Sequence, residues 1–300
     1  MVKKFKKIII YILLAPSKAL IHLVFSYERI MQLILPQMTK KFRNDFINLI
    51  DKDIEDVNYE GACQRVKFKV HTPNDICSFR QQTFSTKEPE ILEWIEKYGG
   101  DGTFYDVGAN IGIYSLYYAM INKGNVYSFE PSVFNLRQLA KNISINNLED
   151  RIKIISNPLS QFTGFAHFIN SNSDEGGALS AFGVEYGYDG KPIESKIKYS
   201  LLGFSMDELL KNGFIEDPPS LIKIDVDGIE HLILSGAQET LKSNICKSVF
   251  IEVNNEFKKQ SIEVKKILES SGFILHEKRH SEMIEGSNKF GSTYNQIWIK

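Results

Sequence analysis

The chain has 300 residues, of which 43% are hydrophobic and 24% charged, and its formal net charge is −1 at pH 7. These values are typical of a globular protein with one large domain or two small ones, and they exclude binding to nucleic acid through overall positive charge. The three cysteines, Cys63, Cys77 and Cys246, are widely spaced and form no CxxC pair. This pattern argues against a disulfide framework or a structural zinc site and favours a reducing compartment.

The N-terminus combines lysines with apolar residues. Four lysines between positions 3 and 7 precede the apolar run Ile8–Ala15, and a second apolar piece, Ala19–Phe25, follows Pro16-Ser17-Lys18. A membrane-spanning helix needs about 20 mostly apolar residues, and Lys18 would lie near the middle of the span, where a charge costs roughly 2.5–3.5 kcal/mol. Three alternatives stay open: an anchor at a membrane surface through residues 1–35, a helix packed on the protein body, and a cleaved signal peptide.

The chain is predicted to have three parts. Residues 1–60 are predicted to form a helical, lysine-rich extension, because apolar residues recur at helical spacing. Residues 61–100 form a lead-in, with a strand predicted from the alternation at 66–70 and a helix predicted over Glu88–Tyr98. Residues 101–300 form the main domain.

In the main domain, predicted strands alternate with predicted helices. The strands are Phe104–Val107, Val126–Phe129, Ile152–Ile155, Leu221–Val226 and Ser248–Val253, and the helices are Ile113–Ile121, Asn135–Asn146, Ile229–Leu241 and Ser261–Ser271. This alternation predicts an α/β fold with a doubly wound, mostly parallel sheet and helices on both faces. Two final strands, Phe273–Leu275 and Gln296–Ile299, have no helix between them and are predicted to pair antiparallel at one edge.

The stretch YDVGANIG, Tyr105–Gly112, joins the first strand of the main domain to its helix. Gly108 permits a sharp turn and a close approach of the backbone to a ligand at the carboxyl end of the strand, and Gly112 lets the helix begin close by. The dinucleotide fingerprint G-x-G-x-x-G is absent, and Asn110 obstructs the approach that a pyrophosphate needs. The loop therefore favours a ligand with a ribose and a charged tail.

Two carboxylates accompany this loop. Glu130 follows the second strand directly, 18 residues after Gly112, where a carboxylate can accept hydrogen bonds from both ribose hydroxyls. Asp106, at the end of the first strand, can accept from an ammonium group or order a water molecule, and the pair also suits a sulfonium cation. The alternative is a simple strand–helix turn with Glu130 on the surface.

The stretch IDVDGIEH places three carboxylates and a histidine within seven residues at the end of a central strand. Asp225, Asp227 and His231 are candidate general bases, and the strand end of Asp225 faces the ligand crevice. In the structural alternative, Glu230 caps a helix and His231 is an exposed residue of its first turn.

Five stretches together resemble the FkbM family of S-adenosylmethionine-dependent methyltransferases. They are KEPEILEWI (Lys87–Ile95), FYDVGANIGIYSLYYA (Phe104–Ala119), FEP (Phe129–Pro131), LIKIDVDGIEHLILSGAQ (Leu221–Gln238) and YNQIWI (Tyr294–Ile299). The resemblance extends from roughly Ser78 to the C-terminus. It implies a class I methyltransferase, Rossmann-like fold with a seven-stranded sheet that ends in an antiparallel hairpin.

The resemblance also implies a cofactor, S-adenosyl-L-methionine, and the residues that bind it. Asp106, Gly108, Asn110 and Gly112 would lie at its methionine side, Glu130 at its ribose and Asn157–Ser160 by its adenine. Pro158 has no N–H to donate, so contact in that segment would come from Leu159 or Ser160.

The implied activity is an O-methyltransferase that acts on a sugar hydroxyl of a bacterial glycan or glycolipid precursor, with a small secondary metabolite as another acceptor. An alcohol must lose a proton on methylation, so Asp225, Asp227 and His231 are the predicted catalytic residues. The glycine-rich insert Asn170–Ser200 is expected to cover the acceptor, with Tyr186 and Tyr188 against a sugar ring and Asp174, Glu175 and Asp189 on its hydroxyls. A mobile, solvated insert is the alternative.

No metal is predicted, although Glu252–Asn255 with Asp225 or Asp227 offers oxygen ligands for Mg²⁺. Two other functions stay open: a nicotinamide-dependent sugar oxidoreductase, which the missing fingerprint disfavours, and a non-catalytic membrane-surface scaffold. The expected partner is a small-molecule or glycan acceptor and not nucleic acid, and the expected location is the cytoplasm, with peripheral contact at the inner face of the cell membrane under the anchor alternative.

Overall fold

The structure, a computed structural model, describes residues 16, 18–24, 26–31, 33, 37–38, 40–41, 43–45, 53–62, 64–194, 197–280, 283 and 290–300. They belong to two compact units, Met1–Asp53 and Ile54–Lys300. In the first unit, the described residues between 16 and 45 are helical. Among the helices of these described residues, none is long and apolar enough to cross a membrane. The predicted lysine cluster and the apolar run Ile8–Ala15 lie outside the described residues.

The second unit begins with a hairpin of β1 (Ile54–Glu60) and β2 (Arg65–His71). The helical extension predicted for residues 1–60 is therefore wrong at its end. Val57 is buried opposite Phe68, and the ring of Tyr59 packs edge-on against Phe84 at 5.7 Å between centroids. Side chains two positions apart thus reach the core, but only Val57 and Tyr59 are apolar on this face, which is too few for a strand period to be recognised in the sequence.

Seven strands form the central sheet in the order β11-β12-β10-β9-β3-β4-β5. They are β3 (Thr103–Val107), β4 (Val126–Phe129), β5 (Ile152–Ile155), β9 (Pro219–Ile224), β10 (Ser248–Asn254), β11 (Ile274–Arg279) and β12 (Thr293–Ile299). The strands from β10 to β5 run parallel, and β12 pairs antiparallel with both β10 and β11. This order and the antiparallel β12 are those of a class I methyltransferase, so the predicted fold class is confirmed.

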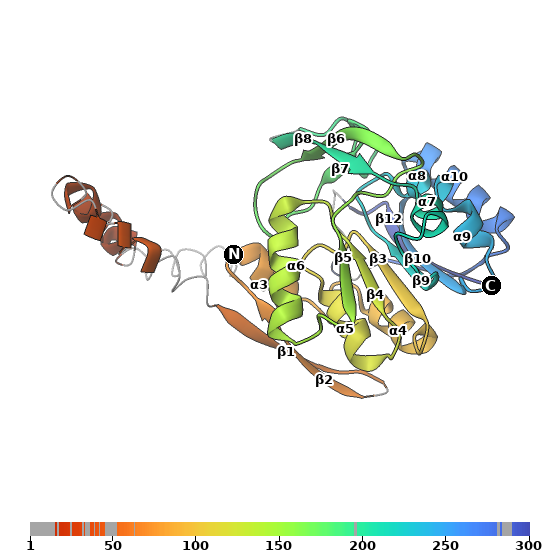
Figure 1. The fold of residues 1–300 in the computed structure, drawn as a ribbon, viewed down its shortest axis with the longest axis horizontal. Helices are drawn as coiled ribbons and strands as arrows, with labels where there is room; N and C mark the ends of the chain where they lie inside the picture. Colours follow the sequence, from red (N-terminus) through yellow and green to blue (C-terminus); the bar gives the residue numbers. More distant parts are fainter. Residues whose placement is uncertain are drawn as a thin grey trace, which may run out of the picture. The chain divides into compact units, whose positions relative to one another are not determined.

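Helices cover both faces of this sheet (Figure 1). On one face lie α4 (Pro89–Tyr98), α5 (Ile113–Ile121) and α6 (Val133–Ile145), and on the other α8 (Glu230–Ser235), α9 (Gln238–Lys242) and α10 (Lys258–Ser270). Successive strand residues face opposite cores: Phe104 and Phe250 pack against Trp94 of α4, whereas Tyr105 and Ile251 belong to the core on the other face. Fully burying such a side chain contributes about 1.5–3 kcal/mol, so both faces hold the strands in place.

The sequence predicted a single helix over Ile229–Leu241, and the structure divides it into α8 and α9. Gly236 ends α8, and its carbonyl accepts a hydrogen bond from the Asp207 amide at 3.0 Å. A Cβ on Gly236 would lie 2.2 Å from the carbonyl oxygen of Ser160. The break therefore comes from close packing against a segment distant in sequence, which apolar spacing does not reveal.

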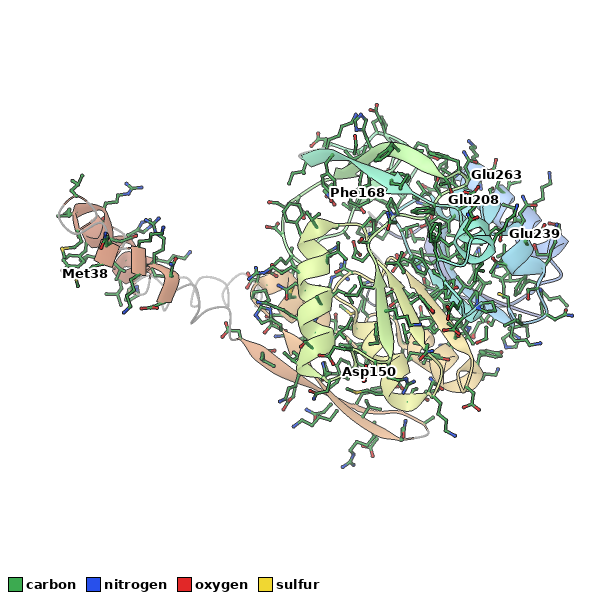
Figure 2. The ribbon with its side chains drawn as sticks, viewed as in Figure 1. Met38, Asp150, Phe168, Glu208, Glu239 and Glu263 are labelled. Atoms are coloured by element: carbon green, nitrogen blue, oxygen red, sulfur yellow. The ribbon has the colours of Figure 1, made fainter. Side chains whose placement is uncertain are left out.

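A second, three-stranded sheet has the order β7-β6-β8 and lies at the end of the unit that is uppermost in Figure 1. It consists of β6 (Gly164–Asn170), β7 (Ser180–Phe182) and β8 (Ile197–Gly203), and Phe168 of β6 is labelled in Figure 2. The interval Asn170–Ser200, predicted as one long loop, therefore contains β7 and the start of β8. These short strands form by pairing with β6, and a three-residue strand has too little periodicity to be recognised alone.

Two further helices escaped prediction, and one of them matters for the site. Helix α7 (Met206–Lys211) follows β8, and α3 (Asp75–Gln82) follows the predicted turn Pro73-Asn74-Asp75. The side chain of Asn74 caps α3 by accepting from the Cys77 amide at 2.9 Å. Because Cys77 is the one fully buried residue of α3, the helix has no apolar stripe that would mark it in the sequence.

Candidate active site

A cavity of about 510 Å³ opens at the carboxyl ends of β3, β4, β9 and β10. The loop after β3, the end of β4 and the turn after β9 contribute to its wall, as parallel strands of a doubly wound sheet commonly do. Residues of α3 and of the segment 83–88 form another part of the wall. Residues 176–182, which include β7 of the small sheet, form a further part of the wall. The cavity is thus assembled from segments spread over most of the second unit.

The loop after β3 turns sharply at Gly108, which has a φ of 79°. A Cβ there would lie 2.0 Å from the carbonyl oxygen of Asp225, so only glycine fits. The amides of Gly108 and Ala109 both donate to the carbonyl of Phe129, at 3.0 Å each. Asn110 follows in the left-handed region with a φ of 54°, and its side chain donates to the carbonyl of Gly177 at 2.8 Å. Gly108, Ala109 and Asn110 therefore line the cavity as a loop fixed by backbone bonds.

Gly112 does not line the cavity. It has a φ of 84°, caps the start of α5, and would place a Cβ 2.3 Å from Cδ1 of Leu139 in α6. Gly112 therefore allows α5 to pack on α6. It lies behind the cavity wall, whereas the sequence predicted it in the wall.

Glu130 lines the cavity directly after β4 and is 5% exposed. One carboxylate oxygen accepts from the amide of Asn110 at 2.7 Å and the other from the amide of Ser132 at 2.8 Å. Burial raises the pKa of Glu130 to about 7, although these two hydrogen bonds oppose the rise. The carboxyl group therefore ties the β3 loop to the β4 loop and still faces the cavity.

Asp106 is fully buried and does not line the cavity. Its carboxylate accepts from the hydroxyl of Ser115 at 2.6 Å, and it pairs with the ammonium of Lys223 at 3.2 Å. Lys223, in the central strand β9, also lies 3.7 Å from the carboxylate of Asp225 and donates to the carbonyl of Gly108 at 3.3 Å. Burial lowers the pKa of Lys223, but Asp106 and Asp225 more than offset this and raise it above its ordinary value. Lys223 thus joins both acidic motifs beneath the cavity.

Asp225 and Asp227 both line the cavity, but their surroundings differ. The side chain of Asp225 is 29% exposed and has Lys223 as its ionic neighbour. Asp227, with a φ of 60°, accepts from the amides of Leu179 at 2.7 Å and Ser180 at 3.1 Å. Burial and the nearby charge of Asp225 raise the pKa of Asp227 to about 6. Asp227 therefore fastens the start of β7, whereas Asp225 is available to a ligand.

The remaining acidic residue of this stretch, Glu230, is buried and supports the turn. One oxygen accepts from the amides of Val226 at 3.2 Å and Gly228 at 3.1 Å, and the other accepts from the side chain of Gln260. Burial raises the pKa of Glu230 to about 7. Glu230 is thus a structural residue in the first turn of α8, but its carboxylate holds the turn before the helix and makes no helix-cap hydrogen bond.

The structure does not bring His231 to the cavity. The ring is 0% exposed, packs edge-on against Phe257 at 5.8 Å, and lies 3.8 Å from the carboxylate of Glu263 on α10, which is labelled in Figure 2. Burial lowers the pKa of His231. The alternative that His231 is exposed is also wrong, because helical geometry turns it toward α10 and away from Asp225 and Asp227.

On the opposite side of the loop, the segment after β5 contributes Pro158 and Leu159 to the cavity. Ser160 is buried and does not line it, and its amide donates to the carbonyl of Phe204 at 2.9 Å. In the insert, Tyr188 lines the cavity and its ring contacts Phe290 at 4.9 Å, whereas Tyr186 packs on Phe257.

The three acidic residues predicted to bind sugar hydroxyls are absent from the cavity lining: Asp174, Glu175 and Asp189. Glu175 pairs with Arg137 at 2.7 Å, and Asp189 with Lys191 at 3.2 Å. The insert therefore contributes mainly backbone and apolar side chains to the wall.

The charged residues of the site that escaped prediction include Lys87, Glu88 and Lys223, whereas the sequence offered Glu252 only as an oxygen ligand for Mg²⁺. The ammonium of Lys87 pairs with Glu88 at 3.1 Å, and the hydroxyl of Tyr114 donates to the same carboxylate at 2.8 Å. Burial, together with the charges of Asp225 and Glu88, raises the pKa of Glu252 well above its ordinary value. All four residues line the cavity. A lysine in an apolar central strand, as in LIKIDV, was the available signal for Lys223, because a buried charge requires a partner.

Among the residues that the structure describes, no group of three or more His, Cys, Asp or Glu side chains could hold a metal ion.

Comparisons with known proteins identify the domain. Residues 106–275 match the model of the methyltransferase FkbM domain. The hexuronic acid methyltransferase AglP of Haloferax volcanii is 25% identical over 177 residues, which make up 59% of this chain and 66% of that protein. The chain thus spans just under two thirds of the length of this curated relative.

Two solved structures are similar at lower identity. The methyltransferase FkbM from Methylobacillus flagellatus KT is 15% identical with a TM-score of 0.44, and the match covers 75% of this chain and 52% of that one. The ribosomal protein L11 methylase from Lactobacillus delbrueckii subsp. bulgaricus is 12% identical with a TM-score of 0.43, over 71% of this chain and 78% of that one.

Proposed function

This chain belongs to the FkbM family of methyltransferases, and we propose that it transfers a methyl group from S-adenosyl-L-methionine to a sugar hydroxyl of a bacterial glycan or glycolipid precursor. One observation carries the proposal: a carboxyl group on the donor side, Glu130, and a partly exposed carboxylate, Asp225, line the same cavity. The first suits the donor's ribose and the second an acceptor hydroxyl.

The residues present fit the donor. The cavity volume of about 510 Å³ lies in the range of about 300–1,000 Å³ for small-molecule sites. Glu130 would bind the ribose hydroxyls, and the backbone at Gly108 and Asn110 would lie against the methionine part. The apolar side chains of Phe129 and Leu159 would pack against the adenine. When bound, S-adenosyl-L-methionine supplies an electrophilic methyl group on a sulfonium ion.

Asp225 is the proposed general base. It lines the cavity, whereas Asp227 is engaged with the amides of Leu179 and Ser180, and His231 packs against α10. A positioned base contributes typically 10²–10⁴-fold to a proton transfer. Burial and the nearby charges of Asp225 and Glu88 raise the pKa of Glu252 well above its ordinary value, which favours the protonated form; in that form it would donate a hydrogen bond to an acceptor oxygen.

Two observations support a sugar as the acceptor. The relative from Haloferax volcanii carries the name hexuronic acid methyltransferase, and hexuronic acids are sugars. In this chain, the rings of Tyr188 and Phe290 lie together at the cavity wall and offer an apolar surface for the face of a sugar ring. The non-catalytic scaffold is disfavoured because the carboxyl groups of the site face a cavity rather than solvent.

A second acceptor group, a sugar carboxylate, is favoured by the cations Arg80 and Lys87 in the cavity wall and by the name of the relative. A carboxylate is ionised at neutral pH and needs no general base. Substitution of Asp225 separates the two: Asp225→Asn should slow methylation of a hydroxyl about 10²- to 10⁴-fold and leave methylation of a carboxylate largely intact.

We also propose that the protein works in the cytoplasm, in peripheral contact with the inner face of the cell membrane through residues 1–35. The side chains of Leu20, Leu23 and Leu33 are 63%, 68% and 87% exposed in the first unit, which supports this contact. Deletion of residues 2–18 should release the protein from membranes in fractionated cells. An unchanged distribution would contradict the anchor.

Mass spectrometry of host glycans with and without the gene tests the main proposal. A methyl-group mass difference that depends on the gene supports it. Binding of the purified protein to S-adenosyl-L-methionine and to NADH is the companion measurement. Tight binding of NADH without binding of S-adenosyl-L-methionine would overturn the methyl donor and favour an oxidoreductase.

A further inference from the structure

The cavity wall contains a cation that methylation of a sugar hydroxyl leaves unused. Arg80 lies in the last turn of α3, is half-buried and lines the cavity. The other two cations of the wall have carboxylate neighbours, because Lys87 pairs with Glu88 at 3.1 Å and Lys223 with Asp106 at 3.2 Å. Within the described part of the chain, no ion pair joins Arg80 to a carboxylate.

The position of the guanidinium is nevertheless fixed. Its Nε–H donates to the carbonyl of Gly176 at 2.8 Å, and the amide of Gly176 donates to the side chain of Asn135 at 2.9 Å. A guanidinium has five N–H donors, so four remain on the two Nη atoms. Among the described residues, none accepts a hydrogen bond from them. The wall of a ligand-sized cavity therefore contains a guanidinium fork that is fixed in position and has free N–H donors.

The charge of this fork reaches both halves of the cavity. Burial raises the pKa of Glu130 and of Asp227, and the charge of Arg80 opposes the rise at each. Glu130 belongs to the donor half and Asp227 to the acceptor half. An anionic group that enters this cavity meets five carboxyl groups, Glu88, Glu130, Asp225, Asp227 and Glu252, so it needs a cation that is not already paired.

We propose that Arg80 forms a subsite for a carboxylate group of a bound ligand. Its planar fork matches the two oxygens of a carboxylate in a way that a lysine ammonium does not. Two ligands of the proposed reaction could carry this group: the methionine part of the donor, whose α-carboxylate is its one anionic group, and an acidic sugar acceptor. The inference rests on the proposed function.

Calorimetric titration of the full-length protein tests the donor as the source. S-adenosylhomocysteine carries the α-carboxylate, and 5′-methylthioadenosine lacks the whole amino-acid end. If the donor's carboxylate binds Arg80, Arg80→Gln should weaken S-adenosylhomocysteine about 10- to 100-fold, the scale of charged hydrogen bonds, and leave methylthioadenosine unchanged. Arg80→Lys should recover only part of the affinity, because it keeps the charge and loses the fork.

A matched control removes the structural explanation. Arg137 pairs with Glu175 at 2.7 Å, so it holds the same turn that Arg80 holds through Gly176, but it does not line the cavity. Arg137→Gln should leave the affinity for S-adenosylhomocysteine unchanged. An equal loss in both variants would mean that the turn matters and not a carboxylate, and would overturn the subsite.

Two probes test the acceptor as the source: p-nitrophenyl glucuronide and p-nitrophenyl glucoside. At neutral pH they differ in one group, a carboxylate in the first and a hydroxymethyl group in the second. If the acceptor's carboxylate binds Arg80, saturation-transfer NMR should show the glucuronide bound more tightly than the glucoside, and Arg80→Gln should abolish the difference. S-adenosylhomocysteine should then bind the variant normally.

The outcomes distinguish this inference from the proposed function. If the unmutated protein fails to bind S-adenosylhomocysteine, the proposed function fails first. If it binds S-adenosylhomocysteine and Arg80→Gln changes neither this affinity nor the preference for the glucuronide, the carboxylate subsite is wrong while the methyltransferase proposal stands.

Discussion

The proposed donor side and the proposed acceptor side of the cavity are held by different combinations of contacts. On the proposed donor side, the contacts are hydrogen bonds from backbone amides: those of Asn110 and Ser132 donate to Glu130, and those of Gly108 and Ala109 donate to Phe129. On the proposed acceptor side, backbone amides also hold Asp227, but ion pairs between side chains are added, as in Lys87 with Glu88. Backbone bonds depend little on residue identity, whereas ion pairs change with single substitutions. A donor site held by backbone bonds can thus be combined with an acceptor site that single substitutions alter, as expected where function lies in sites grafted on a fold.

Gly108 and Lys223 lie where the two sides meet. Gly108 turns the donor loop against the carbonyl of Asp225, and Lys223 bridges Asp106, Asp225 and the Gly108 carbonyl. Substitutions of these two residues should damage both sides at once. Substitution of Asp225 should affect only the acceptor side, and substitution of Glu130 only the donor side.

The largest effect is expected for Gly108→Ala. The new Cβ would lie 2.0 Å from the Asp225 oxygen, so the loop or the turn must move, and the free energy of unfolding should fall by about 4 kcal/mol. Urea denaturation measures this, and binding of S-adenosylhomocysteine should be lost. Gly213→Ala is the matched control, since Gly213 also has a positive φ, 68°, but has nothing within 4 Å of its Cβ. Its cost should be about 1–3 kcal/mol of strain, and equal losses in both variants would contradict the clash.

Lys223→Met comes next. It leaves the buried Asp106 without its cation, and breaking a buried ion pair costs about 3–5 kcal/mol. Lys67→Met removes an exposed pair with Asp56 and should cost less than about 1 kcal/mol. Adding Asp106→Asn to Lys223→Met removes the uncompensated charge and should restore part of the stability. A double variant no more stable than Lys223→Met would show that charge pairing is not the reason.

Asp225→Asn should separate the two sides. Turnover on a hydroxyl acceptor should fall about 10²- to 10⁴-fold, because the proposed base is lost, while the affinity for S-adenosylhomocysteine changes far less. Single-turnover experiments measure the rate, and calorimetry measures the affinity for S-adenosylhomocysteine. Asp101→Asn, at an exposed position outside the cavity lining, should alter neither. An undiminished rate in Asp225→Asn would remove Asp225 as the base and favour a carboxylate acceptor.

Glu130→Ala should affect the donor side alone. We expect it to weaken S-adenosylhomocysteine by about 1–3 kcal/mol, the scale of charged hydrogen bonds. Glu149→Ala, an exposed position just beyond α6, serves as the control and should bind normally. Unchanged affinity in Glu130→Ala would exclude Glu130 from the ribose site.

The smallest effect concerns pH. Burial raises the pKa of Glu130 and Glu230 to about 7 from 4.5, and that of Asp227 to about 6 from 3.8. Each carboxyl keeps its proton in the folded protein at pH values where the unfolded chain has lost it. These three carboxyls should therefore make the free energy of unfolding of the ligand-free protein fall as pH rises from about 4 to about 7. Urea denaturation across this range measures the slope in the unmutated protein and in Glu130→Gln, in which one of the three contributions is lost. An unchanged slope in Glu130→Gln would contradict the pKa shift of Glu130.

Much of the fold was visible in the sequence where a segment's own periodicity determines its structure. Helix α5 and strands β4 and β5 have the predicted bounds, because continuous apolar runs or helical spacing are local properties. Strands β1, β7 and β8 escaped prediction, because they depend on pairing with partners elsewhere in the chain. The same distinction explains α8 and α9, which are separated by a contact between Gly236 and Ser160.

The candidate site divides in the same way. The sequence by itself determined that Gly108, Asn110, Glu130 and Asp225 would meet at one edge of the sheet, because the carboxyl ends of parallel strands lie together. Only the tertiary structure decided that Asp106 faces Lys223, that His231 faces α10, and that Arg80 from an unpredicted helix faces the cavity. The physical reason is that the succession of strands and helices along the chain follows from local patterns, whereas the direction and the charge partner of each side chain depend on residues distant in the chain, such as Phe257 for His231 and Lys223 for Asp106.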